Sequence, residues 1–195
     1  LPILINSGGN ATYSGLVTLG SASSIIGDTG TITLSNASTI TGSGFGLTLG
    51  GAQGGTISSI IGTGTGTLTK QDAGTWNLAG VNTFTGNITI NNSGGILAVT
   101  GSGSLSGTST GVYSGSISIG SSSTFKYSSS ANQTLQTGVI SGAGDLTKDT
   151  NASSILTLTG TNTYTGVTTI NAGTISVATI GDGGTAGNLG QATNA

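Results

Sequence analysis

Short runs of alternating apolar and polar residues recur along this chain of 195 residues. Thr31-Ile-Thr-Leu34 and Leu156-Thr-Leu158 are typical, because their apolar side chains fall on one face of a strand and Thr on the other. No stretch shows the three- and four-residue apolar spacing of an amphipathic helix. Glycine-rich segments such as Gly50-Gly51 separate the runs and favour tight turns. The pattern predicts an all-β chain.

A longer pattern occurs twice, in residues 66–99 and 144–177. Both stretches contain Leu-Thr-Lys, then Asn-Thr-(Phe/Tyr)-Thr-Gly, then Ile-Asn and a short apolar strand. A shorter signature, an aromatic residue, then Ser or Thr, then Gly, occurs four times, at Tyr13 and Gly15, Phe84 and Gly86, Tyr113 and Gly115, and Tyr164 and Gly166. The steps between its aromatic residues fit three, one and two turns of about 25 residues. We therefore predict one domain, residues 1–195, built as a parallel β-helix of about eight coils.

The two ends of the chain differ in character. The most apolar run comprises Leu1, Pro2, Ile3, Leu4 and Ile5. Pro2 lacks a backbone N–H, which places this run at the start of a strand or on a sheet edge. It either covers one end of the solenoid or is an assembly strand that joins copies head to tail. Residues 181–195 are small and polar, and predict a loose last coil or a frayed end.

The composition argues against nucleic-acid binding, membrane helices, metal binding and catalysis. Charged residues make up 4% of the chain, against roughly 25% in ordinary domains, and Arg, Glu, His, Cys and Met are absent. There is no basic patch for nucleic acid, no apolar run near the roughly 20 residues of a membrane helix, and no usual ligand set for a transition metal. A serine nucleophile would lack a His base. We expect no catalytic residue, no metal site and no cofactor.

Five Asp residues supply all the acidic side chains. Asp72 and Asp149 lie close to Lys70 and Lys148 at the same point of the two repeats, so the four would line one edge if the repeats stack. We interpret them as a solvated turn that opposes edge pairing. The alternative, an enzyme that cleaves polysaccharides, needs a clustered pair of carboxylates that the sequence does not display.

The aromatic residues of the signature have two interpretations, an interior stack between coils or a row that binds sugar rings. Their equivalent positions in the repeat favour the interior stack. Trp76 alternates with Leu78 and is predicted to lie in the core. Thr-x-Thr rows such as Thr31-Ile-Thr33 leave open a further alternative, a surface that binds carbohydrate or ice, although their spacing is irregular.

The long repeats resemble the passenger-associated transport repeat of autotransporter passenger domains. The matching residues are Leu68-Thr-Lys70, Asn82-Thr-Phe84-Thr-Gly86, Ile90-Asn91 and Gly95, then Leu146-Thr-Lys148, Asn162-Thr-Tyr164-Thr-Gly166, Ile170-Asn171 and Gly173, followed by the similar closing segment Gly187-Asn-Leu-Gly190. The resemblance implies a right-handed parallel β-helix that is exported and then displayed on a bacterial surface or released. It carries no catalytic residues. We expect an extracellular structural protein of fibre or adhesin type, with copies of itself and surface glycans as partners.

Overall fold

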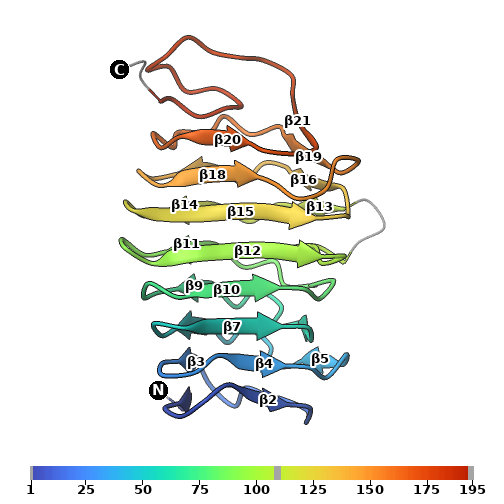
Figure 1. Cartoon of the computed structure of the whole chain (residues 1–195). Helices are drawn as coiled ribbons and strands as arrows, with labels where there is room; N and C mark the ends of the chain where they lie inside the picture. The colour runs from blue at the N-terminus through green and yellow to red at the C-terminus, as the bar shows by residue number, and fades with distance from the viewer. Residues whose placement is uncertain (1, 108–110, 193–195) are drawn as a thin grey trace.

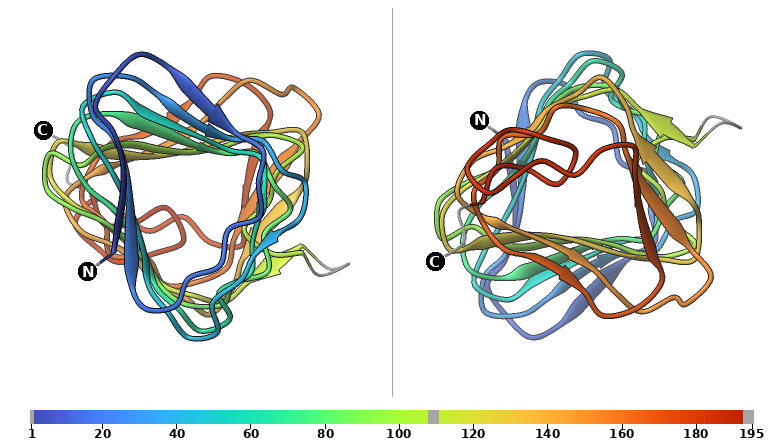
Figure 2. Two further views of the ribbon diagram at one scale, coloured as in Figure 1. Left: turned by 90° about the horizontal axis from the view of Figure 1, so that it is seen from below. Right: turned by 90° about the horizontal axis from the view of Figure 1, so that it is seen from above.

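The computed structural model describes residues 2–107 and 111–192, and all regular structure in this part of the chain is β-strand. The chain rises as a stack of coils from the N-terminus to the C-terminus, with a roughly triangular cross-section (Figures 1 and 2). The front strands run from left to right as the chain ascends, so its path is right-handed (Figure 1). One sheet contains a strand from each of eight coils. The predicted fold class, an all-β parallel solenoid, is confirmed.

Two long parallel sheets form two of the three faces. The eight-stranded sheet, at the front of Figure 1, contains β2 (Ala11–Tyr13), β4 (Ile32–Leu34), β7 (Gly54–Ile57), β10 (Thr75–Leu78), β12 (Gly95–Gly101), β15 (Ser123–Ser129), β18 (Asp145–Lys148) and β20 (Thr168–Ile170). The seven-stranded sheet contains β1 (Ile3–Asn6), β3 (Ser23–Gly27), β6 (Leu47–Gly50), β9 (Leu68–Lys70), β11 (Ile88–Ile90), β14 (Ile117–Ile119) and β17 (Ile140–Ser141).

The third face is less regular. It contains the pair β5 (Thr39–Ile40) and β8 (Ile60–Ile61), and the sheet of β13 (Val112–Tyr113), β16 (Gln133–Leu135), β19 (Ile155–Leu158) and β21 (Thr174–Val177). The length of one coil also varies. The coil that leads from Ile155 to its neighbour Thr174 is shorter than the coil that leads from Ile88 to its neighbour Ile117.

A continuous apolar core fills the inside of the solenoid. Along the eight-stranded sheet, Leu34, Ile57, Leu78 and Val99 are in register in successive strands and are essentially unexposed. The predicted core position of Trp76 is confirmed, since it is fully buried and its indole N–H donates to the Gly50 carbonyl at 2.9 Å. Strand alternation therefore sorts side chains between the core and the surface in every coil.

Hydroxyl groups cover the outside in two registered rows. The outward row of the seven-stranded sheet begins with Ile3 of β1 and continues with the hydroxyl residues Ser24, Thr48, Thr69, Thr89, Ser118 and Ser141. That of the eight-stranded sheet consists of Thr12, Thr33, Thr56, Asn77, Ala98, Lys126, Thr147 and Thr169. Thr suits such positions because its branched side chain packs well on a pleated surface. The second row contains Thr at every coil except three consecutive ones.

Candidate functional site

Lys70 is a buried cation at the corner between β9 and β10. It ends β9 in the inward-facing row, and its side chain has no exposed surface. Its Nζ donates to the carbonyls of Gln71 at 2.7 Å, Asp72 at 2.6 Å and Gly94 at 2.5 Å, and Gly94 belongs to the next coil. These acceptors match the three N–H groups of an ammonium. Burial lowers the pKa of Lys70 to about 8, with the charge of Asp72 opposing this shift, so the side chain is charged at neutral pH.

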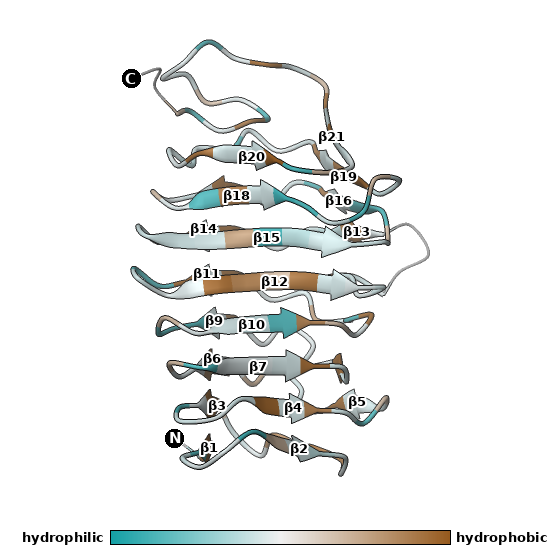
Figure 3. Ribbon diagram, in the orientation of Figure 1, coloured by the Kyte–Doolittle hydropathy of each residue, from teal (hydrophilic) through white to brown (hydrophobic). Residues whose placement is uncertain are grey.

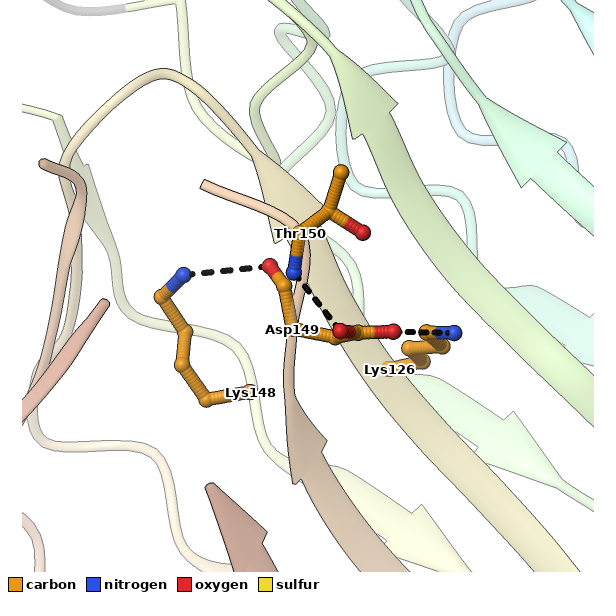
Figure 4. Close-up of polar contacts among 4 residues, drawn as sticks. All are labelled: Lys126, Lys148, Asp149 and Thr150. Atoms are coloured by element: carbon orange, nitrogen blue, oxygen red, sulfur yellow. Dashed lines mark hydrogen bonds and ion pairs between the residues drawn. The ribbon is translucent and has the colours of Figure 1, made fainter. Parts of the chain in front are cut away.

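Lys148 is the equivalent buried lysine of the second repeat, but its carbonyl partners lie in its own turn. It ends β18, has no exposed surface, and lies over the ring of Tyr127 with its Nζ 5.7 Å from the ring centroid. Its Nζ donates to the carbonyls of Asp149 at 3.3 Å and Asn151 at 3.5 Å, and Figure 4 shows the first of these contacts. Burial lowers the pKa of Lys148, while the charge of Asp149 raises it. Its hydrogen bonds are longer than those of Lys70, so this corner is held less tightly.

The solvated edge of lysines and aspartates predicted from the sequence is therefore wrong. In Leu-Thr-Lys the lysine shares the inward face with leucine, because alternate residues of a strand point the same way. The two repeats also lie on different faces, since Lys70 belongs to the seven-stranded sheet and Lys148 to the eight-stranded sheet. Equivalent residues of the two repeats are therefore not stacked along one edge. The ion pair that does form joins Lys126 to Asp149 at 2.6 Å.

Both lysine turns need a left-handed residue two positions after the lysine. Asp72 has a φ of 61° and Thr150 a φ of 74°. Aspartate adopts this region fairly readily, whereas a β-branched residue rarely does. The turn after Lys148 therefore stores backbone strain at Thr150.

Asn82, the first residue of the Asn-Thr-Phe-Thr-Gly segment in the first repeat, is a buried bridge between coils. Its Oδ1 accepts the Ile61 N–H at 2.9 Å, and its Nδ2 donates to the carbonyls of Gly80 at 3.0 Å and Ser104 at 2.8 Å. Ile61 lies in the preceding coil and Ser104 in the following one. One amide thus satisfies backbone groups of three coils that water cannot reach.

Asn162 repeats this arrangement near the C-terminal end. It is buried, its Oδ1 accepts the Ile140 N–H at 2.8 Å, and its Nδ2 donates to the Asn188 carbonyl at 2.6 Å. The repeated Asn is visible in the sequence, but its bridging role is not, because asparagine is mostly a surface residue.

Three of the four signature aromatics, Phe84, Tyr113 and Tyr164, lie in the interior. The rings of Phe84 and Tyr113 meet edge to face, with centroids 5.7 Å apart. Tyr113 Oη donates to the Gly86 carbonyl at 2.5 Å. Tyr13 lies elsewhere in its coil, in β2 beside Leu34, and is 49% exposed. Because coil length varies, the same short signature does not always fall at the same place on the solenoid.

The signature glycines allow two kinds of close approach. A Cβ at Gly86 would collide with the carbonyl oxygen of Gly66 in the coil below, and the same holds for Gly166 and Gly144. A Cβ at Gly15 or Gly115 would instead overlap the phenol of the tyrosine two residues earlier. Gly86 and Gly166 are needed because backbone lies where a side chain would begin, whereas at Gly15 the exposed Tyr13 ring could move aside.

The N-terminal end of the solenoid is open. Leu4 and Tyr13 occupy inward rows beside Ile25 and Leu34, yet they are 46% and 49% exposed. Together with Leu16, which is 69% exposed, they border an open hollow of about 580 Å³. β1 and β2 each pair on one side only.

The predicted assembly strand forms most of this end. β1 begins at Ile3, and the carbonyl of the preceding Pro2 accepts the Ser24 N–H at 2.9 Å. Ile3 and Ile5 are 62% and 53% exposed. Leu1 lies outside the described residues.

The C-terminal end is covered. After β21, residues 178–192 cross the end of the stack without forming a strand (Figure 2, right). Asn188 Oδ1 accepts the N–H groups of Ala178 at 3.0 Å and Thr179 at 2.9 Å, and its Nδ2 donates to the Gly160 carbonyl at 2.9 Å. Leu189 packs against the core. This segment contains the Gly187–Gly190 sequence that follows the second repeat.

The described residues contain no group of three or more acidic side chains placed to hold a metal ion. In the same part of the chain there is no helix long and apolar enough to cross a membrane.

Comparison with known proteins agrees with this architecture. The family model described as passenger-associated-transport-repeat matches residues 68–99 and 153–177. The adhesin BmaC autotransporter of Brucella suis biovar 1 (strain 1330) is 38% identical over an alignment 189 residues long; the alignment covers 75% of this chain and 6% of the relative. No solved structure matches. The chain is a parallel β-solenoid that matches passenger-associated transport repeats over residues 68–99 and 153–177 and is similar to part of an autotransporter adhesin.

Proposed function

We propose that this chain is a structural, non-enzymatic rod in an exported adhesin-type protein of the cell surface. The matched repeats and the similarity to a protein named as an adhesin support this role. So does the architecture, since a continuous apolar core enclosed by neutral hydroxyl rows makes a stiff rod without a catalytic cluster. The chain spans 6% of the curated relative's length, so its place within a larger protein belongs to the proposal.

The observation that carries the proposal is the open N-terminal end. Its core is exposed in a hollow, and the free edges of β1 and β2 carry no charged residue that would discourage pairing. A further coil in parallel register would bury Leu4 and Tyr13 and satisfy both edges. We therefore place a second copy of this chain there, stacked head to tail through the strand Leu1–Ile5, so that copies form filaments.

The other end offers a surface for this contact. Val167 and Ile170, before and at the end of β20, are 64% and 54% exposed beside the covering segment. The incoming β1 and β2 would meet this apolar surface. A head-to-tail contact joins two different surfaces, so it propagates instead of closing.

Electron microscopy of the purified chain, with sedimentation over a range of concentrations, tests the proposal. We expect filaments whose axial repeat is close to the length of one subunit. Leu4→Asp with Ile5→Lys should abolish them, and so should Val167→Asp with Ile170→Lys. A control, Val81→Asp, alters an exposed apolar residue of the middle coils and should leave filaments unchanged.

Three results would contradict this mode of assembly. Filaments that persist in the Leu4 and Ile5 variant would show that the strand is not the joint. Dimers that resist the Val167 and Ile170 changes would show that two N-terminal ends meet each other. Isolated rods at all concentrations would remove self-assembly and leave the rod itself in place.

A further inference from the structure

The outward row of the eight-stranded sheet changes character in the middle of the rod. The row has Thr in β2, β4 and β7, then Asn77, Ala98 and Lys126 in three successive strands, and then Thr again. Ala98 is 3% exposed, since it is shorter than its neighbours and lies below them. In Figure 3, β12 is the brown strand in the middle of the front sheet. The interruption leaves a depression in an otherwise even surface.

A groove of about 390 Å³ occupies this depression. Ile96 and Ala98 of β12 form its apolar floor, with Asn77 of β10 on one side and Lys126, Ser128 and Thr150 on the other. Its volume is within the range of pockets that hold small ligands.

Ser128, which borders the groove, has a hydroxyl with unused hydrogen-bonding capacity. Its residue is 7% exposed, its side chain lines the groove, and its Oγ has no hydrogen-bond partner among the described residues. A buried hydroxyl without a partner is unusual, because leaving it unsatisfied costs free energy. Asn77 Nδ2 is only weakly engaged, at 3.5 Å from the Gly55 carbonyl. Asn77 therefore has hydrogen-bonding capacity for a ligand in the groove, and Ser128 has it after a change of rotamer, since its Oγ is buried in this structure.

The rim of the groove carries no net charge. Lys126 Nζ lies 2.6 Å from Asp149 Oδ2, and the Thr150 N–H donates to Asp149 Oδ1 at 2.8 Å (Figure 4). The hydrogen bond from Lys126 holds the pKa of Asp149 below its usual range, so Asp149 is ionised at neutral pH. An anionic ligand would have to compete with Asp149 for Lys126.

We propose that this groove binds a neutral sugar unit of a surface or environmental glycan. A sugar ring presents one C–H face, which suits Ile96 and Ala98, and an edge of hydroxyls that both donate and accept, which suits Asn77, Ser128 and Thr150. A peptide cannot add as a strand here, since β12 is paired on both sides. The proposal deepens the adhesin-type function and rests on it for the exposure of this face to glycans.

An array of neutral oligosaccharides of glucose, galactose, mannose and N-acetylglucosamine, with sulfated and sialylated counterparts, tests the proposal on the full chain. Ala98→Thr restores the outward Thr and fills the floor, and Ser128→Ala removes the unpartnered hydroxyl. Thr33→Ala, in the same row of β4, is the control. Circular dichroism melts check the fold of each variant, and Ser128→Ala should not lower stability because no hydrogen bond is lost.

We expect the chain to bind at least one neutral oligosaccharide. Affinity should fall about tenfold or more in Ala98→Thr, where the floor is blocked, and about fivefold in Ser128→Ala, the value of one hydrogen bond. Thr33→Ala should bind like the parent chain. Absence of neutral binding, binding confined to sulfated or sialylated glycans, or binding unaffected by both groove variants would overturn the proposal. None of these results depends on filament formation, so the two proposals fail separately.

Discussion

The two ends of this solenoid are built differently. At the C-terminal end, Asn188 ties residues 178–192 to the last coil and Leu189 covers the core. At the N-terminal end, Leu4 and Tyr13 point inward but remain about half exposed. A repeat protein needs a cap wherever its stack stops, because an interior repeat exposes both core and strand edges. Within the described residues, the C-terminal end of the stack is therefore covered, with Val167 and Ile170 left exposed, whereas the N-terminal end is open.

Removing the C-terminal cap should have the largest effect. In Asn188→Ala the N–H groups of Ala178 and Thr179 and the carbonyl of Gly160 lose their partners. We expect the free energy of local opening to fall by about 3 kcal/mol. Hydrogen exchange of residues 155–192 measures it, with the exposed Asn171→Ala as control. Unchanged protection would show that this amide does not hold the cap.

Replacing the buried Lys70 should lower stability somewhat less than loss of the cap. Lys70→Met keeps the length of the side chain but leaves three carbonyls without a donor, while the desolvation cost of the ammonium disappears. We expect a net loss of about 2 kcal/mol in the free energy of unfolding. Lys148→Met should cost less, because its bonds are longer. Denaturant unfolding compares the two, and an equal or larger loss in Lys148→Met would contradict the account.

Alkaline pH tests the same corner without a structural change. The pKa of Lys70 is about 8 in the folded chain and 10.5 in the unfolded chain, so the unfolded chain binds more protons between these values. Stability therefore rises with pH, by about 2 kcal/mol between pH 8 and 10. Lys70→Met should lack this rise, and the difference between the two chains isolates it from the tyrosines. Parallel pH profiles would show that Lys70 does not titrate in this range.

The smallest predicted effect is a gain in stability. Thr150→Gly relieves a φ of 74°, whereas Asp72→Gly changes a residue that tolerates its φ of 61°. We expect Thr150→Gly to raise the free energy of unfolding by about 1 kcal/mol and Asp72→Gly to give no gain. Thermal unfolding measures both. A loss in Thr150→Gly would mean that the threonine side chain contributes more than the strain costs.

Alternation predicted the coils well, because Leu, Ile and Trp76 occupy the inward positions that a strand of period two assigns to them. The same alternation places Lys70 inside. A solvated side chain was nevertheless predicted, because lysine is almost never fully buried unless it is paired. Its partners are backbone carbonyls of two coils, which no residue pattern displays. Tyr13 occupies an inward row beside Leu34, but it is 49% exposed because β2 is the first strand of its sheet and no coil of the described residues covers it.

The groove could not be predicted from the sequence either. Asn77, Ala98 and Lys126 are far apart along the chain, and only the register of β10, β12 and β15 shows that they interrupt one row. The C-terminal cap could not be predicted for the same reason, because it is held by tertiary contacts such as the hydrogen bond from Asn188 to the Gly160 carbonyl. Local patterns specify strands, whereas the ends and faces depend on which coils become neighbours.

Hydrogen exchange at increasing protein concentration tests the contrast between the two ends most directly. If a second copy covers the open end, the amides of residues 3–13 exchange more slowly as concentration rises, while those of β10 in the middle of the rod do not change. Leu4→Asp with Ile5→Lys should remove this dependence. Exchange of residues 3–13 that is the same at all concentrations would contradict the account, because the N-terminal end would then not be an interface between copies.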